Sequence, residues 1–272
     1  MIPYFEIPSI HLVGPFAIHA FGVLVACAIW VGITVQKIRA RQLELDQTAV
    51  SALATWVVLV GFIISHVFDV VAYEPARLLR DPMFLFRNFN ISSFGGLLGA
   101  VVGLVLWQRR YRKPILPYAD ATVFGFVFAW FIGRLGCASA HDHPGRHTDF
   151  FLAVRYPDGP RHDLGFEEAL LTLPLCIAFA IAFRKPRRSG AYIAAACLYY
   201  APVRFLLDSL RATDVSHPDA RYLGLTPGQY AALLMFSYGL WLLGRLLQQP
   251  AGTIAAPAAS TLSEPPAKMP AS

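Results

Sequence analysis

The stretch that indicates the fold most clearly is residues 119–145, ADATVFGFVFAWFIGRLGCASAHDHPG, where a long apolar run ends in a polar loop. Residues 119–137 are long enough to cross a bilayer, because roughly 17 to 25 helical residues span about 30 Å of hydrocarbon. Arg134 lies inside this run, and His141, Asp142 and His143 follow it directly. A charge at such a depth is costly in lipid and usually faces a bundle interior or a polar cavity. The stretch therefore predicts a membrane-spanning helix that ends at a polar site.

The composition of the whole chain agrees with this prediction. Hydrophobic residues make up 56% of the chain, charged residues only 15%, and the mean hydropathy is +0.50, which indicates an integral membrane protein. Apolar windows of spanning length predict an all-α protein with seven transmembrane helices. They are residues 15–36, 49–71, 92–108, 119–137, 168–184, 190–209 and 226–247. The first window lacks a preceding basic segment and a following cleavage pattern, which favours a span over a cleaved signal peptide.

Basic residues gather in alternate connections and predict the orientation. They follow the first, third and fifth windows, at Lys37, Arg39 and Arg41, then Arg109, Arg110, Arg112 and Lys113, then Arg184, Lys185, Arg187 and Arg188. By the positive-inside rule these connections are cytoplasmic, with the N-terminus outside and the C-terminus inside. The net charge of +6 is thus a topology signal, and we expect no nucleic-acid partner.

The remaining composition signals are simple. The four cysteines lie in or at the ends of apolar runs, without metal-type spacing or close pairing, and favour packing roles. Residues 249–272 are rich in Ala, Pro and Ser and predict a disordered cytoplasmic tail. Residues 1–248 are expected to form one polytopic domain.

With this topology, a group of ionisable residues inside the windows falls in the outer half of the bilayer. They are His19, His66, Asp69, Arg134, Arg204 and Asp208, with Arg211 just beyond. Arg204, Asp208 and Arg211 are spaced four and three apart, so they share one helical face and can neutralise each other in part. Two interpretations follow: internal ion pairs that hold helices together, or a polar cavity open to the outer leaflet.

A cavity lined by arginines suits an anionic ligand. Guanidinium groups bind phosphate in bidentate fashion and keep their proton, so an anionic phospholipid is the expected partner. Gly95, Gly96 and Gly99 at the start of the third window allow close approach of either a ligand or another helix.

Six segments in this order resemble the prolipoprotein diacylglyceryl transferase family. The segments GPFAIHAFG (14–22), SSFGGLLGA (92–100) and GRLGCASAHDHPG (133–145) are similar to its GP…HWYG, SFHGGL and GRxGNFxNxExxG motifs. RHDLGFEEA (161–169), YAPVRFLLDSLRATD (200–214) and TPGQ (226–229) resemble RHPSQLYEA, YGxxRFxxExxR and SxGQ. The resemblance implies a bacterial inner-membrane enzyme that moves a diacylglyceryl group from phosphatidylglycerol to the lipobox cysteine of prolipoproteins. It implies no cofactor and no metal.

The resemblance also implies site residues, on the positions that match the family motifs. Arg134 is the signature arginine and an expected phosphate contact. The catalytic residues are expected to be His19, Arg134, Asp142, Arg204 and Arg211. The substrate-binding residues are expected to be His66, Gly95, Gly96, Gly136, Gly145, Asp208 and Gln229. His162 and Glu168 lie on matching positions as well.

Several polar family residues are replaced in this chain. The histidine of SFHGGL is Phe94, the tyrosine of HWYG is Phe21, and the asparagines of the signature are Cys137 and Ala140. The arginine of the family's GAR motif is His66. The reaction needs a base for the acceptor thiol, which Phe94 cannot provide. The candidates at the correct depth are His19, His66, His141 and His143.

Two alternatives to the transferase follow from the same residues. Carboxylates and histidines supply ligand types for a divalent cation, which suggests a metal-dependent phospholipid-processing enzyme on the same scaffold. The residues concerned are His66, Asp69, His141, Asp142, His143, His147 and His162. A catalytically inactive paralogue that only binds phospholipid is the other alternative. An ordinary solvated loop accounts equally for the histidines at 141–147.

Overall fold

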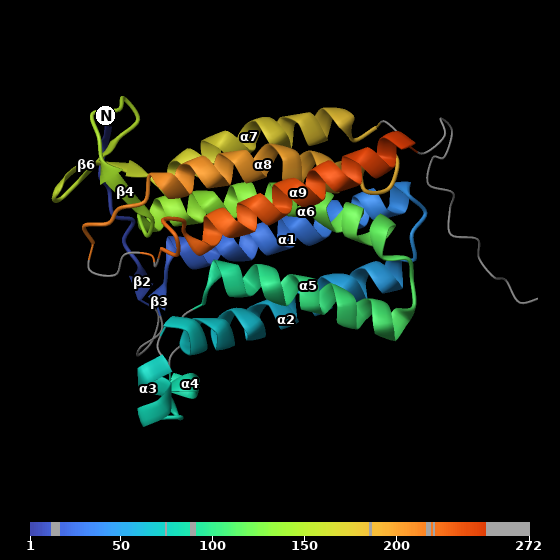
Figure 1. The fold of residues 1–272 in the computed structure, drawn as a ribbon, viewed down its shortest axis with the longest axis horizontal. Helices are drawn as coiled ribbons and strands as arrows, with labels where there is room; N and C mark the ends of the chain where they lie inside the picture. The colour runs from blue at the N-terminus through green and yellow to red at the C-terminus, as the bar shows by residue number, and fades with distance from the viewer. Residues whose placement is uncertain are drawn as a thin grey trace, which may run out of the picture.

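A bundle of long helices with a small β-structure at one end makes up the fold (Figure 1). The computed structural model describes residues 1–11, 17–73, 75–87, 91–184, 187–215, 219 and 221–248. The helices in these ranges are α1 (Ala20–Gln42), α2 (Gln47–Tyr73), α3 (Pro75–Arg80), α4 (Phe84–Arg87), α5 (Ser93–Tyr111), α6 (Ile115–Ala140), α7 (Leu164–Ala182), α8 (Ala191–Ser209) and α9 (Pro227–Gln248). The predicted tail at 249–272 lies outside the described residues.

All seven predicted windows coincide with long helices, with shifted ends. Within the described ranges, five helices are long and apolar enough to cross a membrane: α1, α2, α6, α7 and α9. The windows at 92–108 and 190–209 fall on α5 and α8, which have 19 residues each. The protein is therefore a mostly helical, multi-pass membrane protein. The greatest shift is at α1, which spans Ala20–Gln42 rather than residues 15–36.

Glycines bring the helices of the bundle close together. Gly95, Gly99 and Gly103 lie four residues apart on α5 and face α2. A Cβ atom added at Gly103 would lie 2.7 Å from the carbonyl oxygen of Trp56. A Cβ atom added at Gly99 would lie 2.7 Å from the carbonyl oxygen of Val60. Small residues permit such contact between membrane helices, where dispersion forces and not hydrophobicity drive association. Close van der Waals packing of the two backbones thus stabilises the α2–α5 pair.

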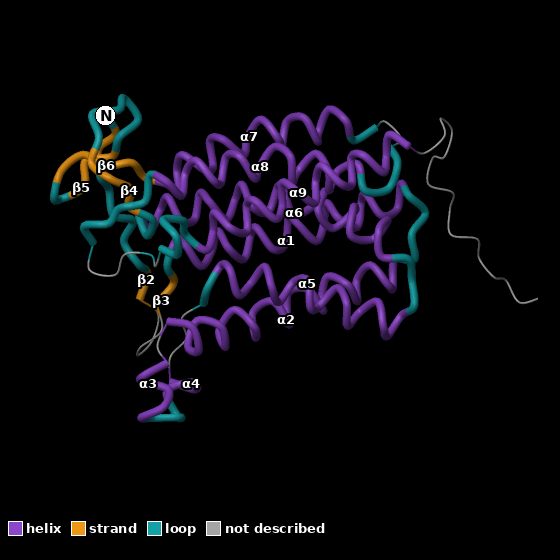
Figure 2. Tube along the Cα trace, in the orientation of Figure 1, coloured by secondary structure: helices purple, strands orange, loops and turns teal. Residues whose placement is uncertain are grey.

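The expectation of a purely helical protein was incomplete, because short strands cap one end of the bundle (Figure 2). Strands β1 (Ile2–Pro3), β5 (Val154–Tyr156), β6 (Gly159–Asp163) and β4 (Pro144–His147) form a sheet in that order. Strands β2 (Ile10–His11) and β3 (Ala17–Ile18) pair antiparallel. These strands have two to five residues, too few for an alternating apolar pattern to emerge from the sequence.

We call the four-stranded sheet of β1, β5, β6 and β4 the β cap, and a buried arginine stabilises it. Arg161 on β6 is almost fully buried and donates hydrogen bonds to the carboxylates of Asp158 and Asp214 and to the carbonyl oxygen of Gly145. Hydrogen bonding to these two carboxylates raises the pKa of Arg161, and the guanidinium lowers the pKa of Asp214 to about 2. The cap is therefore an ion-paired unit at neutral pH.

The polar loop after α6 is fixed by the helix ends on either side of it. Helix α6 ends at His141, whose φ of 50° places it in the left-handed region. Helix α7 begins where the Asp163 carboxylate accepts a hydrogen bond from the amide of Phe166, at 3.0 Å. His141 Nδ1 lies 2.5 Å from the other oxygen of this same carboxylate. One aspartate thus caps α7 and anchors the end of α6.

Candidate active site

Glu168 on α7 is the centre of a buried charged network between three helices. Its side chain has no exposed surface, and it accepts hydrogen bonds from Trp130 Nε1 at 3.0 Å and from the Tyr200 hydroxyl. Arg204 Nη1 donates to its Oε2 at 2.9 Å. Arg134 Nε lies 3.1 Å from its Oε1, an ion-pair distance without hydrogen-bond geometry. One carboxylate therefore connects arginines of α6 and α8.

The network continues along α8 toward the β cap. Arg204 Nη2 lies 2.9 Å from Asp208 Oδ1, and Arg211 Nε donates to the same oxygen at 2.9 Å. Arg211 also pairs with the exposed Asp219, at 2.7 Å. The helical spacing of Arg204, Asp208 and Arg211 predicted these contacts, and the interpretation as internal ion pairs is confirmed for them.

The charges in the buried part of this network do not cancel. It contains three guanidinium groups, of Arg134, Arg204 and Arg211, and two carboxylates, of Glu168 and Asp208. One positive charge is in excess until the exposed Asp219 is counted. The buried part of the network is thus positively charged, and the exposed Asp219 neutralises it at its outer edge.

The Arg134 side chain is held on its other faces as well. Its guanidinium stacks on the Trp130 ring, with the central carbon 4.3 Å from the ring centroid, and Nη1 donates to Cys137 Sγ at 3.7 Å. Only 3% of its surface is exposed. Arg134 is therefore a preorganised charge at the end of α6, and a direct phosphate contact by this residue stays a prediction.

Gln229 and Asp208 are tied to the turn before α9. The Thr226 hydroxyl donates to Asp208 Oδ2 at 2.5 Å, and Gln229 Oε1 accepts from the Thr226 amide at 3.0 Å. Gln229 Nε2 donates to the Phe205 carbonyl oxygen at 3.2 Å. A Cβ atom at Gly228 would collide with the Asp208 carboxylate, so the glycine is required for this approach. Gln229 thus joins the turn before α9 to the backbone of α8.

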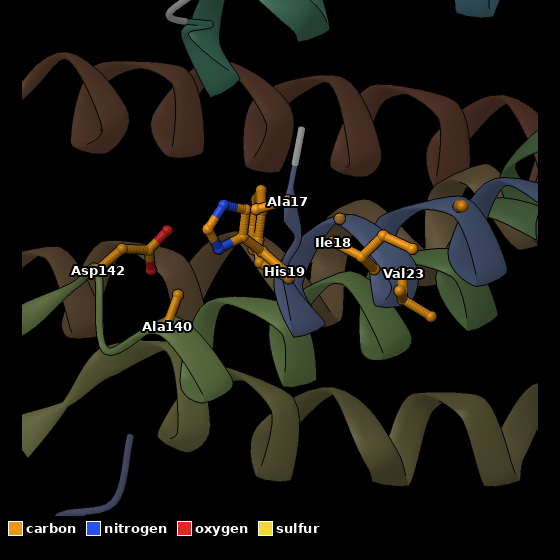
Figure 3. A pocket seen from close by; sticks show the side chains of 9 residues that line it. Ala17, Ile18, His19, Val23, Ala140 and Asp142 are labelled. Carbon is orange, nitrogen blue, oxygen red and sulfur yellow. The ribbon is translucent and has the colours of Figure 1, made fainter. Parts of the chain in front are cut away.

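A cleft of about 560 Å³ lies beside the network, at the start of α1 and the end of α6. His19 and Asp142 line it together with small and apolar residues, and in Figure 3 the Asp142 carboxylate points toward the His19 ring. The cleft is joined to the network through its rim: one ligand atom each of Asp142 and Cys137 lie within 4.8 Å of each other, and Cys137 contacts Arg134. The structure thus brings His19, Asp142 and Arg134 to one end of the bundle.

The other histidines go to separate partners. His141 is buried, bonded to Asp163, and stacked on Tyr4 at 4.4 Å. His162 Nδ1 lies 2.6 Å from Glu167 Oε1, and His147 Nε2 lies 3.5 Å from Asp214 Oδ2. Since each of these rings contacts a different carboxylate, the seven-residue ligand set considered from the sequence does not converge as a whole; of its members, Asp142 and His143 lie together, with His143 Nδ1 2.9 Å from Asp142 Oδ1.

The remaining expected site residues have mainly packing contacts. A Cβ atom at Gly95 would lie 2.7 Å from the Phe68 Cβ of α2, and one at Gly145 would lie 2.7 Å from the His162 Cβ. Gly96 and Gly136 have looser neighbours. His66 Nε2 lies 2.6 Å from the Leu85 carbonyl oxygen, in α4. Contacts of these residues with substrate stay predictions. The Phe94 side chain lies outside the described residues.

Three members of the network were not among the expected catalytic or substrate-binding residues: Trp130, Glu168 and Tyr200. Glu168 lies on a position that matches a family motif, but it is 34 residues from Arg134 and 36 from Arg204, so only the fold reveals that it joins them. Tyr200 lies one helical turn before Arg204 and begins the segment that resembles YGxxRFxxExxR, and these sequence signals point to it.

Comparison with known proteins identifies the family of this chain. The family model "Prolipoprotein diacylglyceryl transferase" matches residues 8–245. The chain belongs to the prolipoprotein diacylglyceryl transferase family. Relatives named phosphatidylglycerol--prolipoprotein diacylglyceryl transferase include that of Glaesserella parasuis serovar 5, which is 30% identical in an alignment that covers 84% of this chain and 88% of the relative. The protein of that name from Synechococcus elongatus is 26% identical and covers 87% of this chain and 88% of its own length. The resemblance stated from the six motifs is thus confirmed, and the network and cleft belong to a member of the diacylglyceryl transferase family.

Proposed function

We propose that this chain transfers a diacylglyceryl group from phosphatidylglycerol to the lipobox cysteine of prolipoproteins. Membership of the family supports the reaction type, as do the names of its relatives. The observation that carries the proposal is the buried network beside a cleft, in which Glu168 and Asp208 hold the guanidinium groups of Arg134, Arg204 and Arg211 at one end of the bundle. Such a site is suited to an anionic glycerophosphate group.

The reaction assigns a task to each part of the site. The acceptor thiol loses its proton, the thiolate attacks the glycerol carbon that carries the phosphate, and glycerol phosphate leaves with the electron pair of the broken C–O bond. The arginines stabilise the charge on the leaving group, and they do so without reorganisation because Glu168 and Asp208 already orient them. Arg134, Arg204 and Arg211 are the residues proposed for this task.

His19 is the proposed general base. It lines the cleft together with Asp142, whereas His141 and His66 are bonded to groups away from the cleft. Asp142 orients the ring and stabilises its charged form after proton transfer. His19 thus takes the task for which the family motif has a histidine at the position of Phe94.

The proposed topology places this site where the lipid substrate resides. Helices α5 and α8 complete a set of seven spans, with the N-terminus outside and the C-terminus cytoplasmic in the bacterial inner membrane. The β cap and the network then lie at outer-headgroup depth, and the Lys- and Arg-rich connections lie at the other end, on the cytoplasmic side. Residues 1–248 are proposed to form the single catalytic domain, followed by a cytoplasmic tail.

Complementation tests the proposal in cells. A bacterial strain depleted of its own transferase is supplied with this chain, with the Arg134→Ala variant, or with Arg110→Ala as a matched control at the opposite end of the bundle. We expect rescue by the native chain and by Arg110→Ala, and none by Arg134→Ala. Failure of the native chain to rescue, with insertion and expression verified, would contradict the transferase function and favour an inactive phospholipid-binding protein.

A further inference from the structure

Cys137, Asp142 and His143 bring three metal-ligating side chains together at the rim of the cleft. One ligand atom of each lies within 4.8 Å of the other two, and His143 Nδ1 is 2.9 Å from Asp142 Oδ1. None of the three is part of the buried ion network. We propose that these residues form a site for a thiophilic divalent cation such as Zn²⁺, which inhibits the enzyme when it is occupied.

The distances fit a small cation. Zinc bonds of about 2.0 to 2.3 Å in tetrahedral geometry place ligand atoms roughly 3.3 to 3.8 Å apart. Since the atoms here are already within 4.8 Å of one another, side-chain rotations that move them by about 1 Å suffice. The residues are Cys, Asp and His, the side-chain types that bind zinc in proteins.

The surroundings support binding at this point. His143 Nδ1 is buried, lies 2.9 Å from Asp142 Oδ1 and makes no hydrogen bond of good geometry within the described residues, so binding a cation breaks no such bond at this atom. Cys137 Sγ lies within 4.8 Å of ligand atoms of both Asp142 and His143, so the sulfur is within reach of a cation bound between them. Glu168 beside Arg134 offsets the repulsion between that guanidinium and the cation. Binding releases the Cys137 thiol proton to solvent as the sulfur–zinc bond forms.

A cation at this position should inhibit transfer because it binds a residue that lines the cleft. This part of the inference rests on the proposed function. Asp142 lines the cleft opposite His19, so a cation bound to Asp142 withdraws the carboxylate from the proposed base. Zinc takes four ligands, so three protein ligands leave one coordination position open. A cation bound at the rim of the cleft can bind the acceptor thiol at this position and keep it from the reaction.

Cobalt titration tests the site without substrate. Purified protein in detergent is titrated with Co²⁺, and the thiolate-to-cobalt charge-transfer absorption is followed, with Zn²⁺ as competitor. We expect one equivalent to bind to the native protein and to the matched controls Cys197→Ser and His147→Ala. Cys137→Ser should lose the charge-transfer band, and His143→Ala should weaken binding at least about tenfold. Binding that is equal in Cys137→Ser and the native protein would overturn the proposal.

A second measurement tests inhibition. Transfer is measured with and without Zn²⁺, and each variant is compared with its own metal-free rate. The native protein and His147→Ala should be inhibited and Cys137→Ser should not. Equal inhibition of Cys137→Ser would contradict the inhibitory role. If metal-free protein shows no transfer, the proposed function fails, while the cobalt spectrum still decides whether the site exists.

Discussion

Replacement of Glu168 by glutamine is the sharpest test of the buried network. The carboxylate lies 3.1 Å from Arg134 Nε and 2.9 Å from Arg204 Nη1, with no exposed surface. At an effective dielectric constant of 20, each pair at about 4 Å between charge centres contributes roughly 4 kcal/mol of attraction. The desolvation of the carboxylate opposes part of this sum.

Glutamine keeps the volume of Glu168 and an acceptor for Trp130 and Tyr200, but it leaves two buried guanidinium groups without their shared counter-charge. Breaking a buried pair by removing one partner costs about 3 to 5 kcal/mol. We therefore expect Glu168→Gln to lower the free energy of unfolding by about this amount, and the midpoint of thermal unfolding by on the order of 10 °C. Transfer activity should fall at least about tenfold, because the arginines lose their orientation.

The adjacent carboxylate supplies the matched control. Glu167 is also buried, but its side chain pairs with a histidine and not with two arginines: Oε1 lies 2.6 Å from His162 Nδ1. Glu167→Gln should cost only about 1 to 2 kcal/mol. The assay is thermal unfolding in detergent micelles at neutral pH, followed by circular dichroism. A Glu168→Gln variant no less stable than Glu167→Gln would refute the central role of Glu168.

Three further predictions follow from other parts of the structure. Arg134→Lys should reduce the rate of transfer at least about tenfold at unchanged protein stability, because lysine lacks the planar group that stacks on Trp130 and orients several donors; mass spectrometry of an acceptor peptide measures it. Gly103→Val should destabilise the protein by about 1 to 3 kcal/mol by forcing α5 from α2, whereas Gly133→Ala, at a position with open space, should not, as compared by thermal unfolding. The contribution of Asp214 to the β cap should be complete above about pH 4, its unfolded pKa, and lost as the pH falls toward 2, its folded pKa; hydrogen exchange of β6 should show this, and Asp214→Asn should weaken the dependence, leaving the share of Asp158, whose pKa Arg161 also lowers.

The helices and the arginine positions followed from the sequence because both depend on local patterns. Apolar runs of spanning length are contiguous, and the contacts of Arg204, Asp208 and Arg211 repeat at helical spacing. The six motif segments added the family and the cleft residues His19 and Asp142. These features needed no knowledge of which helices are neighbours.

The rest depended on contacts between distant segments. The position of Glu168 between Arg134 and Arg204 is set by the packing of α6, α7 and α8, which no spacing reveals. The pairing of His141 with Asp163 arises only once the β cap brings the end of α6 to the start of α7. The glycine-rich start of α5 allowed two interpretations from sequence, and only the structure shows that Gly95 packs directly against α2.

The most direct test of the proposed reaction is the mass of an acceptor peptide. Purified protein in vesicles is mixed with a synthetic lipobox peptide, with either phosphatidylglycerol or phosphatidylcholine as the only lipid. We predict that the peptide gains one diacylglyceryl group on its cysteine with phosphatidylglycerol alone, and that Arg204→Ala abolishes the product. An unmodified peptide with the folded native protein, or an equal yield from Arg204→Ala, would contradict the assignment of this network to diacylglyceryl transfer.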